Sequence, residues 1–111
     1  MLIELIKNQP IMSIELVRNE PNSRKYVLTD KNKQVFGYIV VDRYPEKEIE
    51  WNLELMQIIP QRKGYGTILL KHVMRDMKTD MTVCPTTKQS YAFFRKNGMN
   101  EQNIIINKIN Q

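Results

Sequence analysis

Apolar and polar side chains alternate along residues 48–59, a pattern typical of a half-buried β-strand. The two sets are expected on opposite faces of that strand, with Ile49, Trp51, Leu53 and Leu55 on one side and Glu50, Asn52 and Glu54 on the other. Because proline has no N–H to donate to a sheet, Pro60 ends the strand. Residues 69–77 then repeat apolar side chains at intervals of three and four, which predicts an amphipathic helix. The stretch therefore predicts a strand, a short loop that contains glycine, and a helix.

Shorter alternating segments precede this stretch. Residues 13–18 are expected to form a first strand, and residues 25–29 and 34–41 two more. The residues between the last two, 30–33, read Asp-Lys-Asn-Lys and are a suitable hairpin connection. The two hairpin strands and the central strand are therefore expected to be three consecutive antiparallel strands.

The pattern changes again after the central helix. Three elements are expected there, namely a strand at residues 81–84, a helix at residues 88–96 and a final strand at residues 104–109. Thr86 or Thr87 can cap the second helix at its start, and Gly98 can end it. Strands and helices in this order predict an α+β fold with a mostly antiparallel sheet and flanking helices.

With 111 residues the chain is long enough to bury a core, so residues 1–111 are expected to form a single domain. Residues 1–9 fit either an extra strand or a short helix. Met12 could also be the natural start, which would leave residues 1–11 as an N-terminal appendage. A single cysteine, Cys84, excludes an internal disulfide framework, and no apolar run approaches the length of a membrane span. These features favour a cytoplasmic protein.

The formal net charge of +5 would favour polyanionic partners such as nucleic acid or the phosphates of a coenzyme. The charges are scattered along the chain, however, and no run of arginine and aromatic residues suggests base stacking. A solvated basic surface is therefore the preferred interpretation. With one histidine and one cysteine, the chain has no metal site of the usual His/Cys spacing.

The loop before the central helix carries Gly64 and Gly66. A helix N-terminus offers unpaired N–H groups at the positive end of its dipole, and glycines let a ligand approach the backbone closely. Arg62 and Lys63 add positive charge at the same place. This combination predicts a diphosphate site at the start of the helix, although a tight turn that binds nothing has the same spacing.

Two segments resemble the GNAT superfamily of N-acetyltransferases. Gln61-x-x-Gly64-x-Gly66 is similar to the pyrophosphate motif with which that family binds acetyl-CoA, Gln/Arg-x-x-Gly-x-Gly/Ala, and it lies after a strand and before a long helix. Residues 91–99 resemble a later helix of the family, and the whole resemblance covers roughly residues 25–99. Residues 61–67 read Gln-x-x-Gly-Tyr-Gly-Thr, as in the histone and protein lysine acetyltransferase branch.

The resemblance implies acetyl-CoA as cosubstrate and a set of residues that bind it. These are Leu55, Met56, Gln61, Arg62, Lys63, Gly64, Tyr65, Gly66, Thr67, Lys88 and Phe94. Within that set the backbone N–H of Met56 is expected to stabilise the oxyanion, and the backbone at Leu55 to pair with the pantetheine arm. Many family members have a tyrosine that protonates the leaving thiolate where this chain has Phe94, although the histone acetyltransferase branch also has phenylalanine there.

The resemblance also suggests a general base. Glu50 lies eleven residues before Gln61, the spacing of the catalytic glutamate in the histone acetyltransferase branch, and Glu54 is held in reserve. The plainer alternative is that both glutamates solvate the exposed face of a strand. His72 is expected at the surface, and Cys84 is expected to be a small buried side chain rather than a covalent acyl carrier.

One departure from the family concerns the acceptor side. About seven residues separate Arg18 from Tyr26, which leaves no room for the two helices that GNAT proteins usually have between their first two strands. The acceptor side is therefore expected to be open, or completed by a second copy of the chain. The expected function is direct acetyl transfer to a primary amine, on a protein lysine or N-terminus. The alternatives are a non-catalytic acyl-CoA-binding module and, less favoured, a basic nucleic-acid-binding domain.

Overall fold

The computed structural model describes residues 12–59 and 64–106. Five strands, two α-helices and a short 3₁₀ helix follow one another in the order β1 (Met12–Glu20), β2 (Ser23–Asp30), β3 (Val35–Arg43), β4 (Trp51–Ile58), α1 (Tyr65–Met77), β5 (Met81–Val83), α2 (Lys88–Lys96) and η1 (Glu101–Asn103). The predicted α+β class is confirmed. The segments expected at residues 1–9 and 107–109 lie outside the described residues, as do Gln61, Arg62 and Lys63.

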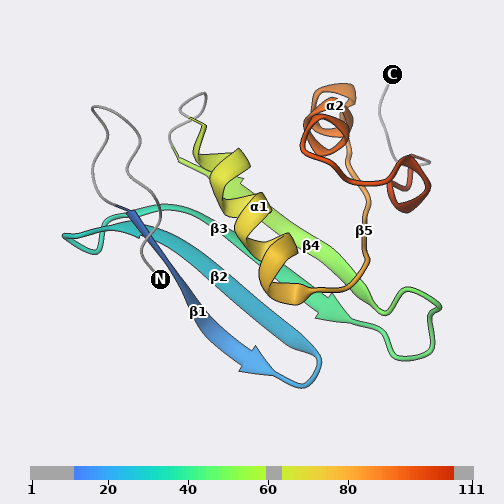
Figure 1. Ribbon diagram of the computed structural model, residues 1–111, viewed down its shortest axis with the longest axis horizontal. Helices are drawn as coiled ribbons and strands as arrows, with labels where there is room; N and C mark the ends of the chain where they lie inside the picture. Colours follow the sequence, from blue (N-terminus) through green and yellow to red (C-terminus); the bar gives the residue numbers. More distant parts are fainter. Residues whose placement is uncertain (1–11, 60–63, 107–111) are drawn as a thin grey trace.

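The strands form one sheet whose spatial order, β1-β2-β3-β4-β5, is also their order in the chain (Figure 1). The first three pairings are antiparallel, and β4 pairs with β5 in parallel after the crossover through α1. Only residues 21–22 separate β1 from β2, so no helix lies between them. This confirms the compact form of the fold that the sequence predicts.

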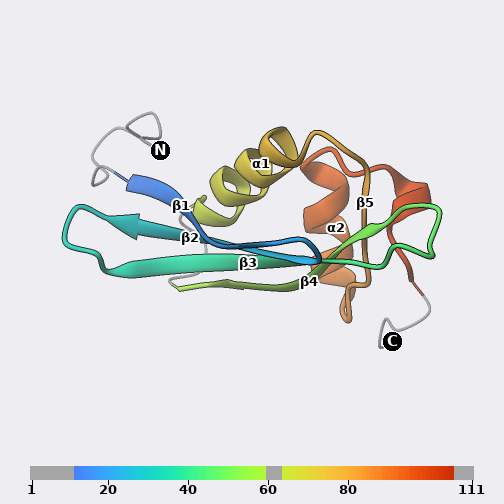
Figure 2. The same cartoon turned by 90° about the horizontal axis from the view of Figure 1, so that it is seen from below.

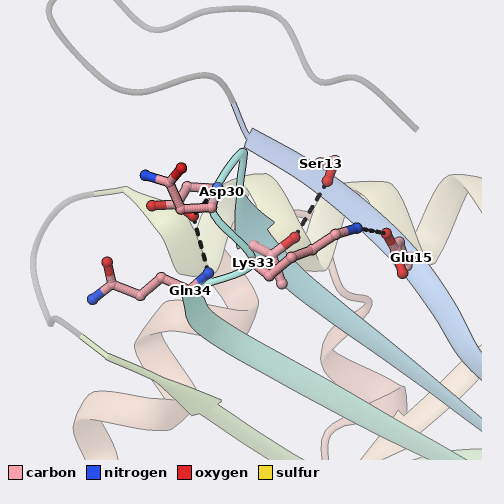
Figure 3. A network of polar contacts seen from close by, with 7 residues as sticks. Ser13, Glu15, Asp30, Lys33 and Gln34 are labelled. Carbon is pink, nitrogen blue, oxygen red and sulfur yellow. Dashed lines mark hydrogen bonds and ion pairs between the residues drawn. The ribbon is translucent and has the colours of Figure 1, made fainter.

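The connection at residues 30–33 is the predicted hairpin turn. The Asp30 carboxylate accepts hydrogen bonds from the backbone N–H groups of Asn32 and Gln34 at 2.8 and 3.0 Å. Lys33 has a left-handed backbone conformation, with φ of 66°, and its ammonium group reaches the Glu15 carboxylate on β1 at 3.1 Å (Figure 3). The turn is therefore stabilised by hydrogen bonds within it and by an ion pair with β1.

The core lies between one face of the sheet and α1 (Figure 2). Strands β1 to β5 contribute Met12, Ile14, Tyr26, Leu28, Ile39, Val41, Leu53, Met81 and Val83, and α1 contributes Tyr65, Leu69, Leu70, Val73 and Met77. The helix buries its apolar stripe against this face, as the spacing of three and four predicts. Neither α-helix lies on the opposite face of β1 to β3.

β4 contains a β-bulge at Glu54. Val40 pairs with Leu55 and Val41 with Leu53, so Glu54 is the extra residue of β4. One additional residue moves every later side chain to the other face of the strand. The expectation that Leu55 shares a face with Leu53 is therefore wrong: Leu53 is buried, whereas Leu55 is 57% exposed.

The second helix begins and ends where the sequence predicts. The Thr87 side chain accepts a hydrogen bond from the Ser90 N–H at 3.0 Å, which makes Thr87 the N-cap of α2. After the helix Gly98 takes a positive φ of 97°. Of the final strand expected at residues 104–109, the structure describes only residues 104–106. There Ile104 forms an isolated parallel bridge with Val83. No helix among the described residues is long and apolar enough to cross a bilayer.

Candidate functional site

The main cleft opens where β4 and β5 separate. The two strands pair at only three positions, the last of which joins Leu53 to Val83. Beyond that pair lies a cleft of about 640 Å³. One wall is formed by residues 53–58 of β4 and residues 64–67 at the start of α1, and the other by residues 83–86 and the α2 side chains. Figure 1 shows β4 and α1 on one side of this gap and β5 and α2 on the other.

The N-terminus of α1 opens into this cleft. Gly64 is the N-cap, with a φ of 78°, and as a glycine it has no side chain with which to cap the helix. A Cβ atom built on Gly66 would lie 3.2 Å from Phe93 Cζ and 3.3 Å from Met56 Cε, so a larger residue would crowd the cleft floor. Gly64, Tyr65, Gly66 and Thr67, all expected to bind coenzyme, line the cleft. The helix dipole and the first-turn N–H groups favour an anion here.

Among the described residues, β4 has no partner strand on the cleft side at Leu55 and Met56. Its parallel pairing with β5 stops at Leu53, whereas Leu55 and Met56 line the cleft beyond that point. The bulge at Glu54 coincides with the position at which the two strands part. An extended ligand could pair with such a strand edge as an added strand does.

Glu54, the bulge residue, lies at the junction of these features. The residue lines the cleft, and its exposed side chain accepts a hydrogen bond from the hydroxyl of Tyr44, which is not among the lining residues. This hydrogen bond, together with partial desolvation and the nearby negative charge, raises the pKa of Tyr44 to about 12. Tyr44 therefore stays protonated at neutral pH and remains a hydrogen-bond donor to the carboxylate.

The structure places Glu50 elsewhere. It is not among the residues that line the main cleft, but it lines a second depression of about 530 Å³ near the start of β4. Its carboxylate accepts a hydrogen bond from Arg43 Nε at 2.7 Å and pairs with Arg43 Nη2 at the same distance. The role of Glu50 as general base stays a prediction, and the geometry brings Glu54, not Glu50, together with the helix N-terminus.

α2 supplies the other wall of the cleft. Phe94, which was expected in the site, is buried and packs edge-to-face against Phe93 with ring centroids 5.3 Å apart. Lys88 is exposed and does not line the cleft. Gln89 and Ser90 do line it and were not predicted. Their spacing to residues 93 and 94 places all four on one helix face, a signal that the sequence already contained.

Two further side chains differ in their surroundings from what the sequence suggests. Cys84 is free and half-buried in the cleft wall, and so is not the fully buried side chain that was expected. His72 is also half-buried, with its ring 6.0 Å from that of Tyr26, and burial lowers its pKa. Within residues 12–59 and 64–106, no group of three or more His, Cys, Asp or Glu side chains could hold a metal ion.

Comparison with known proteins gives one match. The family model described as the acetyltransferase (GNAT) family aligns with residues 4–99 of the chain. Searches among curated proteins and solved structures found no significant match. The matched range contains β4, α1, β5 and α2, the elements that build the cleft.

Proposed function

The chain belongs to the GNAT family of acetyltransferases, and from this premise we propose that it transfers the acetyl group of acetyl-CoA directly to a primary amine of a protein, a lysine or an N-terminus. Acyl transfer from acetyl-CoA to an amine is the activity of the family. The observation that carries the proposal is that the glycine-capped N-terminus of α1, the edge of β4 beyond its pairing with β5, and Glu54 all border one cleft.

We propose that the coenzyme binds along both walls of this junction. The backbone N–H groups at Gly66 and Thr67 would bind the diphosphate, with Arg62 and Lys63 adding positive charge. The pantetheine arm would pair with β4 at Leu55. This places the thioester beside the bulge, where the N–H of Met56 would stabilise the negative charge that develops on the carbonyl oxygen.

The chemistry requires a base because a lysine amine, with an ordinary pKa of about 10.4, is almost wholly protonated at neutral pH. Glu54 would accept a proton from the amine, directly or through a water molecule. The amine nitrogen then attacks the thioester carbon and releases a second proton to water, and the C–S bond breaks as the tetrahedral intermediate collapses to the amide. Phe94 has no proton to give, so the departing thiolate would be protonated by water.

The lining of the cleft supports a protein acceptor over a small polycation. Glu54 is the only acidic residue among the described residues that line the cleft. A polyamine or aminoglycoside carries several positive charges and needs several carboxylates for recognition. A single amine on a polypeptide needs only one.

A second candidate function is a non-catalytic acyl-CoA-binding module. The observation that favours it is Phe94, which lines the cleft but cannot serve as the proton donor that a tyrosine would provide. This module would bind acetyl-CoA but would release CoA no faster than the thioester hydrolyses in solution.

The experiment that tests the binding site is calorimetric titration with acetyl-CoA of the wild type, Gly64→Ala and Gly98→Ala. Both glycines have a positive φ, 78° and 97°, and neither has an atom within 4 Å of a built Cβ, so backbone strain is matched. Only Gly64 lines the cleft. We expect Gly64→Ala to weaken binding roughly tenfold, about 1.4 kcal/mol, and Gly98→Ala to leave it unchanged. Failure of the wild type to bind would overturn the proposal.

A further inference from the structure

β3 has apolar residues on both of its faces. Ile39 and Val41 are fully buried beneath α1, as expected for the inner face. On the outer face, however, Val35, Tyr38 and Val40 are apolar or aromatic as well. A strand of an antiparallel sheet with one face in water normally alternates apolar and polar residues, whereas a near-continuous apolar run is typical of a strand covered on both faces. The composition of β3 therefore indicates a covered outer face.

The neighbouring strands extend these residues into a continuous surface. The outer apolar strip consists of Val27 on β2, Val35, Tyr38 and Val40 on β3, and Leu55 and Ile59 at β4. Val40 pairs with Leu55, and Val27 with Tyr38. Val35, Leu55 and Ile59 are 46%, 57% and 54% exposed, whereas Val27 and Tyr38 are half-buried and Val40 is only 7% exposed. Neither helix covers this side of β1 to β3 among the described residues (Figure 2).

We propose that a second copy of this chain covers the outer apolar strip, with two sheets packed face to face around a twofold axis near the Tyr38–Gln57 pair. The Tyr38 hydroxyl donates to Gln57 Oε1 at 3.1 Å. On each of the two strands, apolar residues lie on both sides of this polar pair. On β4 Leu55 and Ile59 flank Gln57, and on β3 Val35 and Val40 flank Tyr38. A twofold rotation that reverses the strand direction lays apolar side chains on apolar side chains, as an isologous interface requires.

The charges around the strip suit a copy of the same surface. Lys25 and Lys33 supply positive charge, and Glu15, Asp42 and Glu54 supply negative charge. Lys25 lies 4.9 Å from the centroid of the Tyr38 ring, and Lys33 pairs with Glu15 at the margin of the sheet (Figure 3). Because both signs are present, two copies can face each other without net repulsion across the strip, even though each chain carries a net charge of +5.

The area is consistent with a weak dimer. The three strands that carry the strip are spaced about 4.8 Å apart, and with about eight residues each rising about 3.4 Å they present a face of roughly 400 Å². Two such faces bury on the order of 800 Å², a size found among weak and transient interfaces rather than stable ones. Sheets that pack in this way lie about 10 Å apart with their side chains interdigitated.

The proposed interface adjoins the cleft, because Leu55 and Gln57 belong to both surfaces. A second copy would therefore stand beside Glu54 and wall the acceptor side, which the short β1–β2 turn leaves open. The dimer itself does not rest on the acetyl-transfer proposal. Its test measures molecular mass rather than activity, so the dimer and the acetyl-transfer activity can each be disproved without the other.

The test is sedimentation equilibrium of the full chain over a range of concentrations. Val35→Glu and Ile59→Glu each place a carboxylate on the strip outside the residues that line the cleft. Ile106→Glu is the matched control, since Ile106 is 61% exposed but does not belong to the strip. We expect the wild type and Ile106→Glu to approach twice the mass of one chain, with both strip variants dissociating at least tenfold more readily and binding acetyl-CoA as the wild type does.

Three results would overturn the inference. The first is a wild type that remains a monomer up to about millimolar concentration, including the case in which an acceptor protein occupies the strip instead. The second is a dimer that neither strip variant weakens. The third is equal weakening by Ile106→Glu, which would indicate an effect of charge in general. Circular dichroism checks that each variant is folded, and the two strip variants provide independent readings.

Discussion

Glu54 owes its position to a single extra residue in β4. The bulge leaves it outside the β3 pairing, next to the position at which β4 and β5 part, and the residue lines the cleft. Bulges are commonly found beside active sites, where they change the direction of a side chain or end the pairing of a strand. Tyr44 then holds the carboxylate by donating a hydrogen bond to it. Position and orientation thus come from two different parts of the chain.

Glu54→Gln and Glu50→Gln separate the two candidate bases. We expect Glu54→Gln to slow acetyl transfer by about 10²-fold or more, because an amide cannot take the proton of the amine, while acetyl-CoA affinity is retained. Glu50→Gln loses the ion pair with Arg43 and is expected to change the rate much less. The measurement is CoA release with a mixture of lysine-containing peptides as a function of pH.

Three results of that comparison would change the assignment. If Glu50→Gln alone abolishes transfer, the base is Glu50, as the spacing to Gln61 suggests. If both variants retain the wild-type rate and pH profile, neither glutamate is the base. If the wild type shows no peptide-dependent release at all, the non-catalytic module becomes the better description of this chain.

At the residue scale, the sequence identifies what a local motif encodes. The sequence predicts the glycine loop at residues 64 and 66 and the helix that follows it, because the glycines and the apolar spacing are local signals for the start of α1. The exposure of Leu55 could not be predicted, since it depends on a register shift against Val40 and Val41 that alternation alone does not reveal. Contact between Gln61, Arg62 or Lys63 and a coenzyme remains a prediction.

At the scale of elements, α2 carries much of one cleft wall and depends on its N-cap. Thr87 Oγ1 lies 3.0 Å from the Ser90 N–H and 2.9 Å from the Ser90 hydroxyl. Ser90 also lines the cleft, so the same residue takes part in the N-cap and in the wall of the site. The cap therefore fixes the first turn of the helix at the point where it borders the ligand.

Thr87→Ala is expected to lower the free energy of unfolding by about 1 kcal/mol, because the first turn loses its side-chain acceptor. Thr86→Ala is the matched control: this neighbouring threonine was the other candidate cap, but it is exposed and the Ser90 N–H bonds to Thr87. We expect it to change stability by only a few tenths of a kcal/mol. Urea denaturation measures both, and equal losses would argue against the capping role.

The order and type of the elements from β1 to α2 follow from the sequence because each carries a local signal. Alternation marks the strands, spacing of three and four marks α1, and Thr87 and Gly98 bound α2. The parallel pairing of β4 with β5 carries no such local signal, since it depends on how α1 packs on the sheet. The opening of the cleft is a property of that pairing.

At the scale of the whole molecule, a partly buried hydrogen bond joins the sheet to α1. The Tyr26 side chain on β2 is 1% exposed, and its hydroxyl donates to Asp76 Oδ2 at 2.5 Å. Burial, and then the hydrogen bond and charge of Asp76, raise the pKa of Tyr26 to about 12. The folded chain therefore keeps the phenol proton to a higher pH than the unfolded chain, in which the pKa is about 10.

This difference predicts a loss of stability in alkali. The contribution of Tyr26 is complete below about pH 10 and declines as the pH rises from about 10 to about 12, since the unfolded state releases the proton first. Tyr26→Phe is expected to cost about 1 kcal/mol at neutral pH and to reduce the decline in that window. Denaturant unfolding of both proteins between pH 7 and 12 measures it. An identical pH dependence in the two would exclude Tyr26 as the source.

The arrangement of the whole molecule could be predicted only in part. One sheet with helices packed on it follows from the element order, and the absence of helices between β1 and β2 follows from the short segment after Arg18. That no described helix covers the outer face could not be predicted, because a run such as residues 35–41 looks the same whether a helix or another chain covers its second face. That residues 1–111 form one domain remains a proposal.

The shortness of the β4–β5 pairing has a consequence for how the chain folds and opens. The three antiparallel pairings contain eight, seven and seven residue pairs between consecutive strands, whereas β4 and β5 share three. Contacts between neighbours in sequence form early, so the four-stranded meander is expected to fold first and the segment from β5 onward to dock last. The same seam should be the first to open in the native state, with β5 and α2 exchanging their amide hydrogens faster than β2 and β3. A ligand in the cleft would bridge that seam and slow the exchange of β5 and α2.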